Sequence, residues 1–228
     1  MNEERIKDSQ DTWNAIAQSF DHTRKKTWQF CEKYISKINK DNTCIDLGCG
    51  NGRHLRLLAQ QCHQVIGFDI SKNLLMISKK MLKETGLINA TLIQGDLCQL
   101  PIQSNSIDHT LYIAALHNVK QKKNRVQSLR ELYRILKPQG TALISVWKKN
   151  QDRFNQRRKT DQHLDEHGDI IIYWRQHSLN IPRFYHLYEK QEFIDDLEQA
   201  HLTIITIKEI ALSTKQSTDN YYAIVQKQ

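Results

Sequence analysis

Three alternating glycines, directly after a short apolar segment, constrain the fold of this chain more than any other feature. The apolar segment covers residues 43–47, and it is followed by Gly48, Gly50 and Gly52. Glycine allows positive φ angles and a close backbone approach to a ligand, and a helix that begins after such a turn offers free N–H groups. The pattern therefore predicts a strand, a cofactor-binding turn and a helix.

The spacing of the glycines separates two classes of cofactor. Dinucleotide-binding turns have the pattern G-x-G-x-x-G. This chain has G-x-G-x-G instead, with Asp46 standing two residues before the first glycine. A carboxylate at this place repels a diphosphate and attracts a cation. We therefore expect a positively charged cofactor.

Strand and helix patterns alternate along the chain on both sides of this turn. Five apolar runs predict strands, at 43–47, 64–69, 90–94, 106–114 and 141–147. Helical patterns lie between them, at 53–61, 71–84 and 125–136. Such alternation predicts an α/β fold with a mostly parallel sheet and helices on both faces. Two β-rich runs, 202–212 and 221–226, predict a C-terminal antiparallel hairpin.

The flanking segments complete a single predicted domain over residues 1–228. Two helices, 10–20 and 24–38, precede the first strand and are expected to cap the cofactor cleft within residues 1–40. Residues 148–182 interrupt the strand and helix alternation with many charged and amide side chains. We interpret this segment as an insertion near the substrate site, and a solvated loop remains the alternative.

Composition excludes several classes of protein. The five cysteines lack any C-x-x-C pair, which argues against a zinc site or a disulfide framework. We therefore expect no metal. No apolar stretch has the length of a signal or transmembrane segment, so we expect a cytoplasmic protein with no membrane partner. The formal net charge of +8 favours polyanionic partners.

The combination of the glycine turn, an acid after the second strand and a Gly-Asp pair after the third resembles the class I S-adenosylmethionine (SAM) methyltransferases, which have a Rossmann-like fold. The resemblance implies that SAM is the cofactor. It also implies contacts to the methionine end, the ribose and the adenine of SAM. The cofactor residues implied in this way are Asp46, Gly48, Gly50, Gly52, Asp69, Ile70, Asp96, Leu97 and Ala114.

Three further segments resemble the tRNA methyltransferases that esterify 5-carboxymethyluridine at the wobble position. They are residues 13–24, with Trp28 following, residues 114–119, and the run Arg183-Phe184-Tyr185-His186-Leu187-Tyr188. The resemblance implies a tRNA anticodon stem-loop as substrate and a small zinc-ribbon activator as a possible partner. Asn118 stands where relatives frequently have a second histidine.

The expected acceptor chemistry follows from this resemblance. Arg24, Arg183 and His186 are expected to hold the acceptor carboxylate or a neighbouring phosphate, and His117 to lie beneath the acceptor. Trp28 or Tyr185 is expected to stack on the uracil. A carboxylate is ionised near neutral pH, so its methylation needs alignment and no general base.

Other chemistries fit the sequence less well or remain alternatives. An Asn/Asp-Pro-Pro-Tyr/Phe loop, typical of amine methylation, is absent after the fourth strand, and no cysteine nucleophile lies there. A small-molecule O- or C-methyltransferase of the quinone-biosynthesis kind remains an alternative, as does a non-catalytic module that binds RNA or a partner. The basic residues expected to form an RNA footprint lie at 148–159 and at Lys120, Lys122, Lys123 and Arg125.

Overall fold

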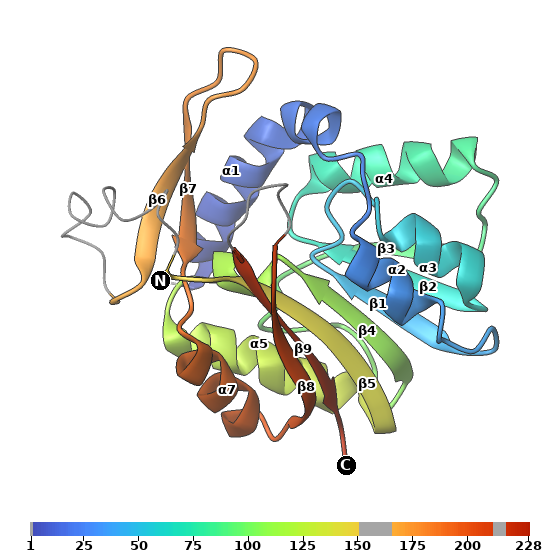
Figure 1. The fold of residues 1–228 in the computed structure, drawn as a ribbon. Helices are drawn as coiled ribbons and strands as arrows, with labels where there is room; N and C mark the ends of the chain where they lie inside the picture. The colour runs from blue at the N-terminus through green and yellow to red at the C-terminus, as the bar shows by residue number, and fades with distance from the viewer. Residues whose placement is uncertain (1, 151–165, 212–217) are drawn as a thin grey trace.

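The computed structural model describes residues 2–150, 166–211 and 218–228, and it is built around a seven-stranded sheet (Figure 1). The strand order is β3-β2-β1-β4-β5-β9-β8. The strands are β1 (Thr43–Leu47), β2 (Gln64–Asp69), β3 (Ala90–Gln94), β4 (Ile107–Ile113), β5 (Leu136–Trp147), β8 (Thr203–Ile210) and β9 (Asn220–Gln226).

The first five strands pair in parallel, while β9 pairs antiparallel with both β5 and β8. The expected fold class is therefore confirmed, including the C-terminal hairpin. The order of the strands reverses between β1 and β4, because β2 and β3 lie on one side of β1 and β5 lies beyond β4. In open α/β sheets, ligands bind at the carboxyl ends of the strands at such a reversal.

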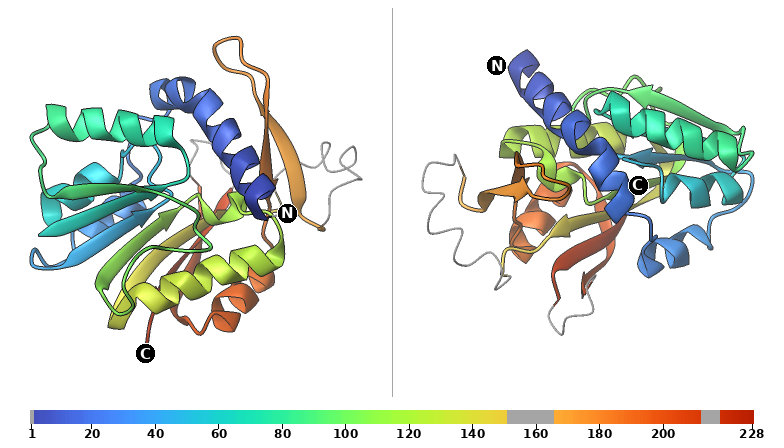
Figure 2. Two further views of the ribbon diagram at one scale, coloured as in Figure 1. Left: turned by 180° about the vertical axis from the view of Figure 1, so that it is seen from behind. Right: turned by 90° about the horizontal axis from the view of Figure 1, so that it is seen from above.

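Helices cover both faces of the sheet (Figure 2). One apolar core lies under α2 (Gln29–Ile35), α3 (Leu55–Gln61) and α4 (Lys72–Glu84). The other lies under α5 (Lys122–Ile135) and α7 (Lys190–Gln199). Side chains alternate between the faces of a strand, so in β4 Leu111 and Ile113 enter the first core and Tyr112 enters the second.

The long helix α1 (Asn2–Thr23) lies beside this sheet and begins eight residues earlier than the apolar spacing predicts. Its first two turns are mostly polar, and Arg5 is held by an ion pair with Asp96 after β3. Further along the helix, Asn14 accepts hydrogen bonds from the Ser71 hydroxyl (2.8 Å) and the Asn73 N–H (3.0 Å) at the start of α4. Tertiary contacts thus extend the helix beyond its apolar stripe.

The helix expected at 24–38 is shorter in the structure. Trp28 has extended backbone angles (φ −100°, ψ 132°), so α2 starts at Gln29 and residues 24–28 form a link.

The insertion expected at 148–182 contains regular structure in its second half. A separate two-stranded antiparallel sheet forms from β6 (Asp169–Trp174) and β7 (Ile181–His186), and this hairpin lies along α1 (Figure 1). The loop interpretation of this part was therefore wrong, because its apolar residues pair across strands. The basic residues of the expected footprint between positions 151 and 165 lie outside the described residues.

Candidate active site

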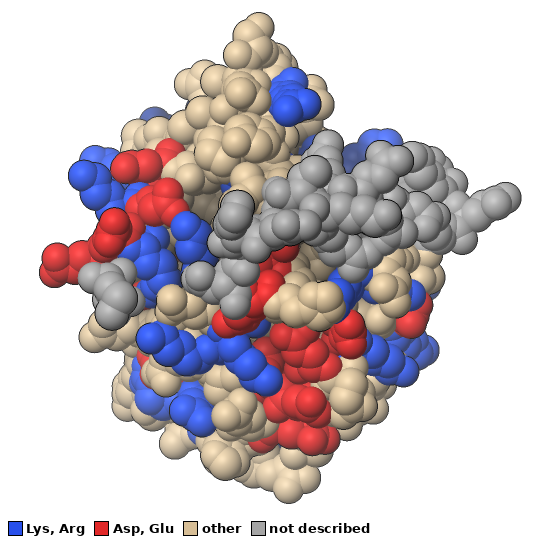
Figure 3. Space-filling view, turned by 90° about the vertical axis from the view of Figure 1, so that its left-hand side faces the viewer, with Lys and Arg blue, Asp and Glu red and all other residues tan. Residues whose placement is uncertain are grey.

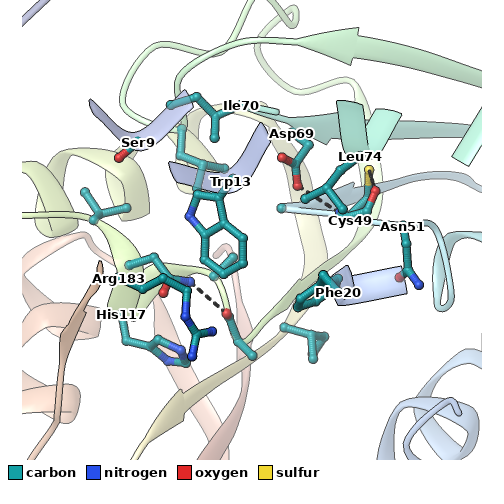
Figure 4. Close-up of a pocket in the computed structure, with 18 of the residues that line it drawn as sticks. Ser9, Trp13, Phe20, Cys49, Asn51, Asp69, Ile70, Leu74, His117 and Arg183 are labelled. Carbon is teal, nitrogen blue, oxygen red and sulfur yellow. Dashed lines mark hydrogen bonds between the residues drawn. The ribbon is translucent and has the colours of Figure 1, made fainter. Parts of the chain in front are cut away.

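A cavity lies at the carboxyl ends of β1, β2 and β4, where the strand order reverses, and α1 and β7 contribute to its walls. Figure 4 shows Trp13 of α1 between Asp69 on one side and His117 with Arg183 on the other. Of the residues predicted for the site, twelve line this cavity: Arg24, Trp28, Gly48, Gly50, Asp69, Ile70, Asp96, Leu97, Ala114, His117, Arg183 and Tyr185.

The glycine turn forms one wall of the cavity. Gly48 and Gly50 have φ angles of 72° and 57°, and a Cβ atom on Gly48 would lie 2.3 Å from the Cβ of Ala115. The turn is fixed because the N–H groups of Gly48 and Cys49 donate to the Phe68 carbonyl (2.7 and 3.0 Å). Only glycine fits the backbone at position 48.

Gly52 has a different place from the other two glycines and does not line the cavity. A Cβ atom there would lie 2.8 Å from the Ser78 hydroxyl and 2.7 Å from the Met81 methyl group, both on α4. Its φ angle is 81°, and the absence of a side chain lets the turn pack closely against α4.

Asp46 is buried beneath the turn with 2% of its surface exposed and does not itself line the cavity. Its Oδ2 atom has no hydrogen-bond partner among the described residues. Burial, reinforced by the nearby Asp69, raises the pKa of Asp46 to about 7, while Arg53 opposes that rise. An orphaned carboxylate oxygen at this place fits a cofactor that carries a positive charge, as SAM does.

Asp69 at the end of β2 is tied to the turn. Its Oδ2 accepts from the Gly50 N–H (2.8 Å) and its Oδ1 accepts from the Ser71 N–H (2.8 Å). Burial raises the pKa of Asp69 to about 6, although these backbone hydrogen bonds lower it. A carboxylate oxygen has a second lone pair, so Asp69 is still able to accept from a ribose hydroxyl.

Asp96 and Leu97 after β3 line the cavity together with Arg5, which forms an ion pair with Asp96. The sequence analysis missed Arg5. No local pattern identifies it, because the apolar spacing that predicts the helix starts at residue 10 and the ion pair joins positions 91 residues apart.

The exit of β4 is strained. Ala114 has a φ angle of 54°, which is rare for a residue with a Cβ atom. Its N–H donates to the backbone oxygen and to the hydroxyl of Ser145 (both 3.1 Å), and its carbonyl accepts from the Asn118 amide (3.0 Å). These bonds hold the loop that carries His117, and strain of this kind is found at functional sites.

His117 is buried, with 1% of its surface exposed, and lines the cavity. Its Nδ1 accepts a hydrogen bond from the backbone N–H of Trp147 (3.0 Å), so the proton of the neutral ring is on Nε2. Burial, together with the nearby His186 and Arg183, lowers the pKa of His117 to about 3. The imidazole is therefore neutral near pH 7.

Arg183 on β7 is held among aromatic rings and lines the cavity. Its guanidinium carbon lies 4.7 Å from the Trp174 ring centre, and it donates to the Tyr185 hydroxyl. Tyr185 in turn stacks in parallel on Trp147, with ring centres 4.4 Å apart. Tyr185 is only 2% exposed, but it lines the cavity and supports Arg183, so its stacking on a uracil stays a prediction.

His186 does not line the cavity, which corrects the prediction that it binds the acceptor. Neighbouring side chains of a strand point to opposite sides, so Arg183 and Tyr185 face the cavity while His186 faces away. Its Nδ1 bonds to Asp169 and its Nε2 to Glu192, each at 2.7 Å. These hydrogen bonds raise the pKa of His186, although burial opposes them.

Arg125 was also placed wrongly by the sequence analysis. It is fully buried and forms ion pairs with Glu166 (2.7 Å) and Glu192 (3.6 Å), so it does not belong to an RNA footprint. Lys120 and Lys122 are paired with Asp8 and Asp196. Figure 3 shows a group of acidic side chains in the lower centre of the hairpin side of the molecule, with basic side chains on either side of it.

The rim of the cavity carries two arginines on tryptophan rings. The guanidinium carbon of Arg24 lies 5.5 Å from the Trp174 ring centre, and that of Arg53 lies 4.5 Å from the Trp28 ring centre. Trp28 also stacks on Phe30, with ring centres 5.7 Å apart. The sequence analysis missed Arg53, and it also missed Trp13 and Phe20 as cavity residues, because their spacing fits a helix core equally well.

None of the helices in ranges 2–150, 166–211 and 218–228 combines the length and hydrophobicity that a bilayer crossing requires.

Comparison with known proteins identifies a methyltransferase domain in the chain. The model of the methyltransferase domain family matches residues 45–144. A tRNA (carboxymethyluridine(34)-5-O)-methyltransferase of Mus musculus is 32% identical over 64% of this chain, which spans only 21% of that relative. A Schizosaccharomyces pombe protein of the same name is 26% identical over 94% of both chains. A demethylmenaquinone methyltransferase of Listeria welshimeri is 31% identical over 60% of this chain and 57% of the relative.

Solved structures share the fold. A SAM-dependent methyltransferase of Methanosarcina mazei has a TM-score of 0.76 at 21% identity and covers 89% of this chain and 98% of its own. A methyltransferase in complex with the Haloferax volcanii Trm112 methyltransferase activator has a TM-score of 0.71 at 17% identity, over 95% and 96%. These similarities support the expected enzyme class and SAM as the cofactor. The chain therefore contains a methyltransferase domain with the fold of SAM-dependent methyltransferases, and it is similar to the tRNA (carboxymethyluridine(34)-5-O)-methyltransferases.

Proposed function

We propose that this enzyme methylates the carboxylate of 5-carboxymethyluridine at the wobble position of a tRNA, which gives the methyl ester. The observation that carries the proposal is Arg183, a cavity residue only 8% exposed with no carboxylate partner among the described residues. A buried charge without a counter-ion is costly. An anionic acceptor in the cavity would offset that cost.

The acceptor arrangement follows from the residues around Arg183. SAM supplies a methyl group on a positively charged sulfur. Arg183 orients the acceptor carboxylate, and the Nε2–H of His117 donates a hydrogen bond to the same group. The acceptor carboxylate is already ionised, so it would take the methyl group of SAM without losing a proton, and S-adenosylhomocysteine would leave. Trp13 and Phe20 exclude water from the cavity.

The cofactor residues have separate roles in this proposal. Asp46 faces the ammonium group of the methionine end, and Gly48 and Gly50 allow the backbone to approach it. Asp69 accepts from the ribose hydroxyls. Ile70, Asp96 and Leu97 contact the adenine, and Ala114 lies next to the methionine end, where its carbonyl orientation is fixed by Asn118.

The resemblance to the Listeria welshimeri demethylmenaquinone methyltransferase supports a second candidate, the methylation of a quinone precursor. A quinone ring is uncharged and apolar, whereas this cavity contains Arg24, Arg53 and Arg183. Unpaired guanidinium groups favour the anionic acceptor.

The test is incubation with labelled SAM and total tRNA that lacks the terminal ester, followed by nucleoside analysis. We expect label in 5-methoxycarbonylmethyluridine, and we expect Arg183→Gln to lower kcat at least about tenfold because a charge-assisted bond is lost. The matched control is Arg130→Gln, an exposed arginine on α5 that does not line the cavity. Label found only in a lipid extract would favour the quinone candidate.

A small zinc-ribbon activator fits the edge of the main sheet. β8 is the last strand of the sheet, and Ile205 on it is 53% exposed. An exposed strand edge of this kind is able to pair with a strand of a partner. Co-expression with such an activator is expected to raise activity, and Ile205→Asp is expected to reduce the gain.

A further inference from the structure

Three arginines form a row across the mouth of the cavity. Arg24 and Arg183 lie on the same indole, that of Trp174, with guanidinium carbons 5.5 and 4.7 Å from its centre. Arg53 lies on Trp28, 4.5 Å from that ring centre. All three line the cavity, and Arg24 is close enough to repel both of the other guanidinium groups.

The row lacks ion pairs among the described residues. Asp21 is near Arg24 in the sequence, but it forms an ion pair with Lys25 and accepts a hydrogen bond from the Asn51 amide (2.8 Å). Arg24 and Arg53 each donate only a long bond to a backbone carbonyl, of 3.2 Å to Thr23 and 3.4 Å to Lys26. Most N–H groups of these two guanidinium groups therefore have no partner among residues 2–150, 166–211 and 218–228.

The charges exceed what one acceptor neutralises. A carboxylate carries one negative charge, and the buried Arg183, held by Tyr185 and Trp174, is the arginine placed to meet it. Two further guanidinium groups lie at the rim, where Arg24 is exposed and Arg53 is half-buried. Asp46 attracts Arg53, and the carboxylate of SAM would offset at most one of these two charges. Burial lowers the pKa of Arg53 to about 10, and repulsion by Arg24 contributes to this, so an additional anion would stabilise the row.

We propose that Arg24 and Arg53 bind a backbone phosphodiester of the RNA, next to the nucleotide whose carboxylate is held by Arg183. This assignment rests on the proposed function. In it, Arg183 binds the acceptor carboxylate, and the other two arginines bind the phosphate. A planar guanidinium fork binds phosphate with two parallel hydrogen bonds, and each fork is kept in place by an indole. The phosphate contacts position the RNA without reading its sequence.

The test measures binding and turnover of a carboxymethylated anticodon stem-loop at several salt concentrations. Arg24→Gln and Arg53→Gln are each expected to reduce the slope of log affinity against log salt by about 0.7, the value for one phosphate on a single strand. The KM for the stem-loop should rise about tenfold, a typical loss for one charge-assisted contact, while kcat falls less. Arg53→Lys keeps the charge and should keep the slope.

The outcomes separate the two proposals. Arg183→Gln should lower kcat by a larger factor than it raises KM, and Arg130→Gln should change neither constant. A salt slope that is unchanged in both rim variants, or a loss confined to kcat, would overturn the assignment of the phosphate. If the wild-type enzyme binds the stem-loop but forms no ester, the proposed function fails, while the slopes of the variants still decide the phosphate site.

Discussion

The backbone N–H of Trp147 donates a hydrogen bond of 3.0 Å to Nδ1 of His117. This bond joins the end of β5 to the loop after β4, and it fixes the tautomer of a buried imidazole. A group between two strand ends at the reversal of the sheet order is well placed to hold an acceptor, because both strands are rigid.

His117→Ala is expected to lower kcat about tenfold to a hundredfold, the range for loss of one well-placed hydrogen bond. Because burial lowers its pKa to about 3, His117 stays neutral above pH 5 and should add no acid limb to the wild-type pH profile. Steady-state kinetics between pH 5 and 9 give the measurement. An acid limb near pH 6.5 that disappears in the variant would contradict this assignment.

The affinity for SAM should increase as the pH rises from about 5.5 to 8. Burial raises the pKa values of Asp46 and Asp69 to about 7 and about 6, so both carboxyl groups are protonated at acid pH. Asp46 then no longer attracts a positive charge, and Asp69 is a weaker acceptor for the ribose hydroxyls. Titration calorimetry is expected to show a change of about tenfold. Asp46→Asn should weaken binding and flatten this dependence, whereas the exposed Asp195→Asn should leave it intact.

Two glycine variants separate a close contact from backbone strain. Gly48→Ala places a Cβ atom 2.3 Å from that of Ala115 at a φ of 72°, whereas Gly86→Ala has a similar φ of 67° with nothing within 4 Å. We expect Gly86→Ala to cost about 1 kcal/mol of unfolding free energy and Gly48→Ala to cost about 3 kcal/mol and abolish SAM binding. Equal losses in chemical denaturation would show that contact with Ala115 is unimportant.

His186 should stabilise the hairpin at low and neutral pH. Its folded-state pKa is raised above 6.5 by Asp169 and Glu192, so its contribution is complete below 6.5 and is lost as the pH rises through the folded-state value. His186→Gln is expected to lose about 3 kcal/mol at pH 6 and less at pH 9, as measured by urea unfolding. A loss that is independent of pH would indicate a role in packing alone.

The sheet and the cofactor turn were predictable because their signals are local. Buried strands appear as apolar runs, and the positive φ angles at Gly48 and Gly50 require glycine, so residues within ten positions of Asp46 specify that part of the site. The contribution of α1 was not predictable. Arg5 reaches Asp96 only because the helix lies across the ends of the strands, and Trp13 lies in the cavity for the same reason.

The prediction of the residues that bind the methyl acceptor was wrong in part, for a different reason. Arg183, Tyr185 and His186 were assigned together because they are adjacent in sequence, but a strand sends adjacent side chains to opposite sides. Once residues 181–186 are known to form β7, His186 must leave the cavity if Arg183 and Tyr185 enter it. Arg125 was also misplaced, because it is buried in ion pairs with Glu166 and Glu192, which lie more than forty residues away in the chain.

The position of α1 and of the β6–β7 hairpin has a consequence for the transfer of function by similarity. The methyltransferase domain match ends at residue 144 and starts at residue 45, so it contains the glycine turn, Asp69, Asp96 and His117 but none of Arg24, Trp28 and Arg183. Similarity over that segment identifies the methyl donor and is silent about the acceptor. Similarity confined to that segment therefore does not separate an enzyme that modifies RNA from one that modifies a quinone.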